Sequence, residues 1–323
     1  MALTFDYFET FDGLAIRWGL AATAARACGT VLFLNGRTEF MEKYGEVVDE
    51  LNRRRYDVYT CDWRGQGLSS RLLGNRMKGH VGRFEDYLAD LEDLAVILEE
   101  RAAPRPYILL GHSMGGHLAV RFLVQRPGFF ERVVLTAPMM DIQLPRYLPP
   151  AFLDWMVRRA LQAGLQEAYV LGSNGRHSHN GRFEGNPLTS DRARFERGLA
   201  MIRRDPRLAV GGVTYGWLSA AFQSIAALNA PERIRSLDVP LLMVTASEDR
   251  IVCPRAQELF CRNLPDGRLV CIEGARHELL VETDVRRARF WEAWDSFIDP
   301  VQSRSKLSTP GVGRRKGPAF PAS

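Results

Sequence analysis

A serine in a sharp turn flanked by glycines is the first residue whose setting points to chemistry. Gly111-His-Ser-Met-Gly115 fits the pattern G-x-S-x-G, between a short apolar run at 107–110 and a helical pattern through Leu118 and Phe122. A strand, a tight turn and a helix in this order expose the serine hydroxyl at the apex of the turn. Glycines suit the flanks because a tight turn leaves little room for side chains. The pattern therefore predicts that Ser113 is a nucleophile.

A serine hydroxyl is a weak nucleophile unless a histidine takes its proton and a carboxylate holds that histidine. In chains with this turn, the acid and then the histidine follow the serine. His277 directly follows the last expected strand, and sheets of parallel strands place their sites at such carboxyl ends. We therefore predict His277 as the base. The other histidines precede the serine, flank its turn or lie in a polar loop: His80, His112, His117, His177 and His179.

Two carboxylates compete for the role of the acid. Glu248 and Asp249 both follow the expected strand at 239–245. The acid has to orient the imidazole and stabilise its protonated form. Position along the chain leaves both residues open.

An oxyanion hole needs two backbone N–H donors near the nucleophile. One comes from the residue after the serine, Met114, and the other from the turn after the strand at 30–34. We therefore expect the amides of Met114 and Arg37 to form it. The side chains of Arg37 and Glu39 lie near the mouth of this site, where they either contact the substrate or pair with each other.

The elements that position these residues alternate along the chain. Apolar residues recur at helical spacing in 40–51, 84–98 and 285–298. Short buried strands alternating with such helices indicate a mostly parallel sheet covered by helices on both faces, an α/β fold. The expected strands span 30–34, 56–61, 107–110, 132–137, 239–245 and 269–272.

One long segment breaks this alternation. Residues 138–230 contain helical pieces rich in aromatic residues and arginine, with no clean strand pattern, and we interpret them as an inserted helical cap. The core then consists of residues 1–137 and 231–299. Residues 300–323 are rich in Ser, Pro, Gly and basic residues, which is typical of a disordered tail.

The composition excludes several classes of protein. The 323 residues are 46% hydrophobic and 25% charged, which is typical of a globular protein whose core needs no disulfide or metal. No apolar run is long enough for a membrane-spanning helix, and the first residues lack a secretory signal. The five cysteines form no CxxC pair, which favours free thiols and a cytoplasmic location. We expect no metal and no cofactor.

The net charge of +5 comes from one segment. Residues 301–323 carry five basic residues and no acid, so residues 1–300 are neutral overall. The high isoelectric point therefore gives no support for a nucleic-acid partner. We expect at most a weak, salt-sensitive contact of this segment with an anionic membrane. Its basic residues are Arg304, Lys306, Arg314, Arg315 and Lys316.

The chain resembles the serine hydrolases of the α/β-hydrolase superfamily. Within them it is similar to bacterial lysophospholipases and monoacylglycerol lipases, whose domain is described as hydrolase-4 or serine aminopeptidase S33. The resemblance covers roughly residues 10–298. Many relatives have His-Gly where this chain has Asn35-Gly36; backbone donors survive this change, but their surroundings differ. The matching stretches are Asn35–Tyr44, Asp62–Ser69, Gly111–Gly116, Thr136–Met139, Asn186–Asp191 and Gly274–His277.

The resemblance implies an α/β-hydrolase fold with a helical cap, and it favours Asp249 over Glu248 as the acid. It implies that Ser113 attacks an acyl carbonyl, that His277 takes its proton, and that water then releases the acyl group. The implied substrate is a small ester of a single-chain lipid, with its acyl chain in an apolar tunnel under the cap. Apolar cap residues fit a tunnel, and fit ordinary packing equally well: Phe152, Leu153, Trp155, Met156, Tyr169, Tyr215, Trp217 and Phe222.

Several functions stay open at this level. The cap carries 11 arginines against seven acidic residues, which suits a phosphate head group, although solvated helix faces explain the excess as well. A lysophospholipase is the first hypothesis, and a monoacylglycerol lipase or a general carboxylesterase is the alternative. A peptidase ranks lower, and a non-catalytic binding protein on a hydrolase fold is the alternative of another class. Dehalogenases and epoxide hydrolases need an aspartate where this chain has Ser113.

Overall fold

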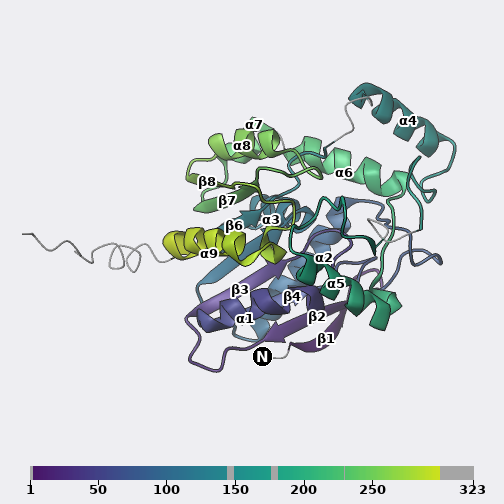
Figure 1. Cartoon of the computed structure of the whole chain (residues 1–323). Helices are drawn as coiled ribbons and strands as arrows, with labels where there is room; N and C mark the ends of the chain where they lie inside the picture. The colour runs from purple at the N-terminus through teal and green to yellow at the C-terminus, as the bar shows by residue number, and fades with distance from the viewer. Residues whose placement is uncertain (1–2, 144–148, 176–180, 229, 299–323) are drawn as a thin grey trace, which may run out of the picture.

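One sheet organises the chain. The computed structural model describes residues 3–143, 149–175, 181–228 and 230–298 (Figure 1). Its eight strands lie in the order β1-β2-β4-β3-β5-β6-β7-β8. Neighbours from β4 to β8 are parallel, whereas β1 and β2 are antiparallel. The predicted mostly parallel α/β fold is confirmed.

The six expected strands all form, and their ends differ from the expected ones by at most two residues. Every residue of β3 and of β5 is buried, which is typical of central strands covered on both faces. The bounds are β3 Gly29–Leu34, β4 Tyr56–Cys61, β5 Tyr107–His112, β6 Arg132–Thr136, β7 Leu241–Ala246 and β8 Gly267–Ile272.

An N-terminal hairpin was not predicted. It consists of β1 (Thr4–Glu9) and β2 (Ala15–Ala21), and β2 joins the sheet by antiparallel pairing with β4. Five of the six residues of β1 are exposed, so the strand has no buried apolar run that would mark it. The strand β1 lies at the edge of the sheet and pairs with β2 alone, so its outer side and most of its side chains remain exposed.

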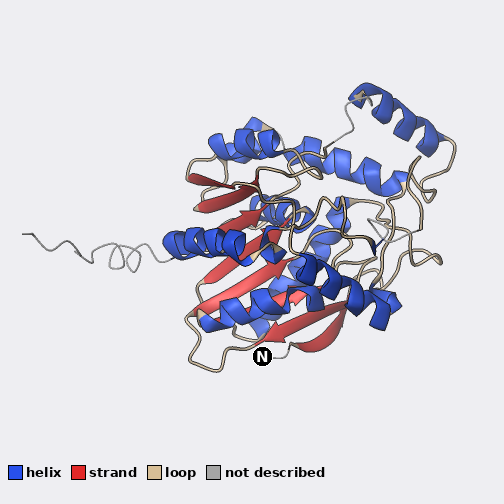
Figure 2. Ribbon diagram, in the orientation of Figure 1, coloured by secondary structure: helices blue, strands red, loops and turns tan. Residues whose placement is uncertain are grey.

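Helices cover both faces of the sheet (Figure 2). The helices α1 (Gly45–Arg53) and α9 (Asp284–Ile298) lie on one face, and α2 (Phe84–Glu100) and α3 (Met114–Gln125) lie on the other. A further helix, α8 (Pro254–Arg262), contacts β7 and β8 and was not predicted. In the described part of the chain, no helix has the length and apolar character needed to cross a bilayer.

The inserted segment (residues 138–230) lies between β6 and β7 in the chain. It contains α4 (Pro150–Gln162), α5 (Arg192–Arg204), the short η3 (Pro206–Leu208) and α6 (Tyr215–Leu228), and α7 (Pro231–Arg235) follows. The helix α4 projects from the rest of the molecule (Figure 1) and packs on α6 through a small separate cluster of apolar side chains. The division into core and cap stays a prediction. The expected tail at 300–323 lies outside the described residues, as do His177 and His179.

Candidate active site

Four loops meet at one edge of the sheet. Because β3, β5, β7 and β8 are parallel, the segments that follow them leave the sheet on the same side. They are the β3 loop (residues 35–40), the turn at Ser113, the segment with Asp249 and the histidine loop (residues 273–278). The sheet thus brings together residues that are up to about 240 positions apart.

Ser113 occupies a strained turn between β5 and α3. Its backbone has φ 53° and ψ −116°, a conformation that a residue with a side chain adopts only when its surroundings impose it. Its N–H donates to the carbonyl of Thr136 at 3.0 Å, and its own carbonyl accepts from the N–H groups of His117 and Met139 at 3.1 and 2.9 Å. These hydrogen bonds hold the turn in place.

Glycine at position 115 allows the turn to approach the β3 loop. A Cβ atom there would clash with the carbonyl oxygens of Leu34 and Asn35. A Cβ on Gly36 would likewise lie 3.1 Å from the Cβ of Ser113. The β3 loop and the serine turn are therefore in direct backbone contact.

Ser113, His277 and Asp249 form one hydrogen-bonded chain. The distance from His277 Nδ1 to Asp249 Oδ2 is 2.7 Å, and that from His277 Nε2 to Ser113 Oγ is 2.9 Å. A carboxylate only accepts, so Nδ1–H donates to Asp249 and Nε2 is left to accept the serine proton. The other oxygen of Asp249 accepts from the N–H groups of Ile251 and Val252, at 2.8 and 3.1 Å. The neighbouring Glu248 is exposed, and its N–H donates to Ala275.

The pKa values of the pair follow from burial and mutual attraction. Burial acts to raise the pKa of Asp249, but the charge and hydrogen bond of His277 outweigh it and leave that pKa below its ordinary value. Burial acts to lower the pKa of His277, and Asp249, with smaller contributions from Glu278 and Glu39, raises it above its ordinary value. Asp249 thus stays ionised, and the imidazolium is stabilised.

The predicted oxyanion donors lie beside the serine. Met114 is the first residue of α3, and Arg37 lies in the β3 loop that contacts Ser113. The Arg37 side chain instead donates to the carbonyl of Gly211 at 3.1 Å and lies over the ring of Trp217. Burial lowers its pKa to about 10. The oxyanion role of the two backbone amides stays a prediction.

Asn35 lies in the β3 loop at the position where many relatives have histidine, and its side chain packs beneath the loop. It is fully buried, its Nδ2 donates to the carbonyl of Cys61 at 2.9 Å, and its backbone carbonyl accepts from the indole of Trp63 at 2.9 Å. The asparagine therefore anchors the β3 loop to the segment after β4.

A buried charge cluster adjoins the histidine. It contains Glu39, which pairs with Lys43 and not with Arg37, and sequence reasoning missed its other charged members, Lys43 and Glu278. The ammonium of Lys43 contacts Glu39 at 3.0 Å and Glu278 at 2.5 Å. His112 lies against both Glu39, at 3.8 Å, and the ring of His277, at 5.0 Å between centroids. Burial lowers the pKa of His112 to about 4, so this second imidazole is neutral at pH 7. Glu39 and Lys43 lie in the stretch that carries the family resemblance, which was the available signal.

The stretch Asn186–Asp191 of the inserted segment supports the histidine loop. The fully buried carboxylate of Glu282 accepts from the backbone of Ser190 at 3.1 Å and of Arg276 at 2.9 Å. The guanidinium of Arg276 donates to the carbonyls of Asn186 and Thr189 at 3.1 and 3.0 Å. This stretch and the histidine loop therefore hold each other in position.

The remaining described histidines, His80 and His117, form hydrogen bonds with hydroxyl groups away from Ser113. His117 is fully buried, with Nε2 2.7 Å from the hydroxyl of Ser224, and His80 Nδ1 lies 2.8 Å from the hydroxyl of Thr214. Within the described ranges, His, Cys, Asp and Glu side chains form no group of three or more that could hold a metal ion.

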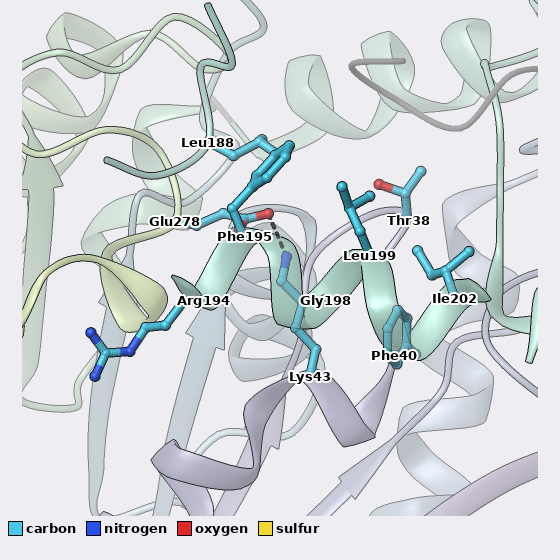
Figure 3. Close-up of a pocket in the computed structure, with 10 residues that line it drawn as sticks. All are labelled: Thr38, Phe40, Lys43, Leu188, Arg194, Phe195, Gly198, Leu199, Ile202 and Glu278. Atoms are coloured by element: carbon cyan, nitrogen blue, oxygen red, sulfur yellow. Dashed lines mark hydrogen bonds and ion pairs between the residues drawn. The ribbon is translucent and has the colours of Figure 1, made fainter. Parts of the chain in front are cut away.

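A small apolar pocket opens between α5 and the β3 loop (Figure 3). Leu199 and Ile202 of α5 lie near Thr38 and Phe40 at one end, and Phe195 lies beside Leu188 and Glu278 at the other, whereas Arg194 points away. Its volume is about 40 Å³, which in this conformation is room for a few water-sized groups and not for a whole acyl chain.

The cap side chains expected to line a tunnel have mixed surroundings. Phe152 and Trp155 stack on each other and are about half exposed on α4, at 49% and 53%. Leu153 packs in the separate cluster with Val157 and Leu218, and Trp217 belongs to the main core. Two of the eight expected residues therefore face solvent here.

Comparisons with known proteins agree with this geometry. Lysophospholipase L2 of Escherichia coli strain K12 is 33% identical over 292 residues, which cover 85% of this chain and 82% of that protein. Monoglyceride lipase of Rattus norvegicus is 25% identical over 251 residues, 76% of this chain and 74% of that protein. The crystal structure of a soluble variant of monoglyceride lipase from Saccharomyces cerevisiae, in complex with a substrate analog, superposes with a TM-score of 0.73 at 21% identity, over 93% of this chain and 96% of that one.

The sheet order, the strained serine turn and the loops at the carboxyl edge define an α/β-hydrolase fold. The model of the family described as Hydrolase_4 (serine aminopeptidase, S33) matches residues 25–284. The chain belongs to this family.

The contact at Gly115 makes a first prediction. In Gly115→Ala the new methyl group meets backbone carbonyls that cannot move without moving β3. We expect the serine turn to shift away from the β3 loop, with a loss in kcat on the order of a hundredfold and a lower Tm. Ester hydrolysis and thermal unfolding measure both. Gly45→Ala is the matched control, because a Cβ there meets nothing within 4 Å and alanine favours a helix. Wild-type kcat in Gly115→Ala would contradict the argument.

The raised pKa of His277 makes a second prediction. The histidine must be neutral to accept the serine proton, so kcat/KM falls as the pH drops through its pKa, which lies above the ordinary 6.5. Asp249→Asn removes the charge that raises this pKa. Its residual activity should therefore persist to lower pH, with kcat reduced by about 10⁴. A pH profile of kcat/KM for both proteins decides, and coincident acid limbs would refute the pairing.

Proposed function

We propose that this protein hydrolyses carboxylic esters of single-chain lipids, with a lysophospholipid as the preferred substrate. The observation that carries the hydrolase activity is the hydrogen-bonded chain from Asp249 through His277 to Ser113. It is aligned for proton transfer from the serine hydroxyl to Nε2.

The reaction follows from these positions. Ser113 Oγ attacks the acyl carbonyl carbon while its proton moves to His277 Nε2, and Asp249 stabilises the imidazolium that forms. The amides of Met114 and Arg37 stabilise the oxyanion. The intermediate collapses when His277 gives the proton to the leaving alcohol, which yields an acyl-serine. Water, activated by the same histidine, then releases the fatty acid.

The relatives support the lipid substrate. The E. coli protein is a lysophospholipase, and the rat and yeast proteins are monoglyceride lipases. The identity is higher to the first, at 33% over most of both chains, and we therefore rank a lysophospholipid above a monoglyceride. The pocket beside α5 has apolar walls that suit part of an acyl chain.

The charge of the cap gives less support than the sequence suggested. Arg192 pairs with Glu184, Arg197 pairs with Glu46, and Arg207 pairs with Asp205. Arg194 contacts three carboxylates. A guanidinium already paired with a carboxylate is a weaker attractor for a phosphate, so the head-group preference rests on the relatives.

The proposal includes a cytoplasmic location with a weak contact at the anionic inner membrane surface. The free cysteines support the location, and the basic composition of residues 301–323, which lie outside the described residues, supports the membrane contact.

The nucleophile can be tested directly. A fluorophosphonate should label the wild-type protein at Ser113, and Ser113→Ala should remove the label. Ser113→Ala and His277→Ala should each lower kcat by about 10⁶, with unchanged circular dichroism. Mass spectrometry locates the label. A folded wild-type protein that takes up no label would exclude a serine hydrolase.

The head group needs a direct comparison. Release of fatty acid from lysophosphatidylethanolamine and from a monoglyceride with the same acyl chain should favour the phospholipid in kcat/KM by at least tenfold, about 1.4 kcal/mol in transition-state binding. Ser113→Ala supplies the blank for both substrates. A higher kcat/KM for the glyceride would make the protein a monoacylglycerol lipase.

A further inference from the structure

One ammonium group joins two loops of the site. Lys43 lies in the short helix η1 (Met41–Tyr44), and its Nζ contacts Glu39 of the β3 loop and Glu278 of the histidine loop. All three side chains are largely buried, with 16%, 4% and 6% of their surfaces exposed. Lys43 and Glu278 are far apart in the chain, so this contact is tertiary.

The Glu39 side of this contact reaches the predicted oxyanion donors. The second carboxylate oxygen of Glu39 accepts the N–H of Gly36 at 2.5 Å. Gly36 precedes Arg37 and lies against Ser113. The contact of Lys43 with Glu39 therefore also fixes the backbone at Gly36, which positions the amide of Arg37.

The Glu278 side reaches the base. Glu278 follows His277 directly, and its N–H donates to the carbonyl of Leu188 at 2.7 Å. A displaced Glu278 would shift the backbone that carries the imidazole.

We propose that Lys43 is a positioning residue for hydrolysis, which sets the distance between the oxyanion donors of the β3 loop and the imidazole of His277. This inference rests on the function proposed above. Catalysis needs the donors and the base at matched positions around one carbonyl group, and small displacements there are costly in rate. Lys43 contacts neither Ser113 nor the imidazole, so it acts through Glu39 and Glu278.

The cluster also carries a net negative charge beside the base. The groups that face His277 are Asp249, Glu278, Glu39 and the neutral His112, with Lys43 behind the two glutamates. Burial, opposed by Lys43 and reinforced by Glu39, holds the pKa of Glu278 above its ordinary value. Two carboxylates against one ammonium leave one negative charge, which stabilises the imidazolium. Glu278→Gln keeps an acceptor for Lys43 and removes that charge.

The test compares kcat, KM and pH profiles on a soluble p-nitrophenyl ester. In Lys43→Met we expect kcat to fall by about tenfold to a hundredfold with KM little changed, and Lys43→Arg to restore most of it. In Glu278→Gln we expect a small change in kcat and an acid limb at lower pH, because His277 loses a stabilising charge. Lys43→Met/Glu278→Leu removes the ammonium and one of its two carboxylates, so only Glu39, which keeps the N–H of Gly36, loses its ion partner. Because one unpaired buried carboxylate costs less than two, this variant should fold even where Lys43→Met does not. It should retain the loss in kcat.

Arg54, the residue that follows α1, offers a matched control. Arg54 also bridges two carboxylates from different elements, Glu50 of α1 and Asp295 of α9, at 2.8 and 2.7 Å. Arg54→Met should leave kcat and the pH profile unchanged.

A wild-type kcat in folded Lys43→Met, or a loss no larger than in Arg54→Met, would overturn the proposal. An unshifted acid limb in Glu278→Gln would overturn its electrostatic part, the negative charge beside His277. These outcomes are distinct from a failure of the proposed function, in which the wild-type protein itself would neither hydrolyse the ester nor react with the fluorophosphonate.

Discussion

The close approach of the serine turn to the end of β3 is the contact on which the site depends. Gly115 has no Cβ, and this lets the first turn of α3 lie against the carbonyls of Leu34 and Asn35. With any larger residue at position 115 the serine turn and the β3 loop would separate. The predicted oxyanion donors, the amides of Met114 and Arg37, could then no longer bind the same carbonyl oxygen of the substrate. The strained φ of Ser113 has the same origin, because the turn must reverse within one residue to bring α3 back over β3. The hydrogen bonds of Ser113 to its neighbours offset that strain.

Three buried carboxylates, those of Asp249, Glu39 and Glu278, lie near His277. Asp249 is held by His277 and two backbone amides, and Glu39 and Glu278 share Lys43. Each carboxylate thus has a partner that offsets its loss of hydration. The result is an imidazole in a negative field, which favours the protonated form that exists only during the reaction. The neutral His112 fills the space behind it without adding a competing positive charge.

Sequence reasoning succeeded where local pattern determines structure and failed where distant contacts do. Parallel strands show as apolar runs, and Ser113, Asp249 and His277 each follow one, so their meeting at one edge could be predicted. The strands before Ser113 and Asp249 are fully buried, whereas β8, before His277, is an edge strand that buries only Ile272. The exposed strand β1 has no such run, and the hairpin was missed. Lys43 and Glu282 were missed for another reason. Lys43 pairs with Glu278, which is 235 positions away in the chain, and Glu282 accepts a hydrogen bond from the N–H of Ser190, which is 92 positions away. No periodicity in the sequence indicates either contact.

The inserted segment consequently has two parts with different physical roles. Residues 186–191 are hydrogen-bonded to Arg276 and Glu282, next to the histidine loop. They therefore help to hold His277 in place, although they lie in the inserted segment. The helix α4 is attached differently: it packs on α6 through Leu153, Val157 and Leu218 and leaves Phe152 and Trp155 half exposed. Changes in α4 therefore act on its packing against α6, whereas changes at 186–191 act on the position of His277.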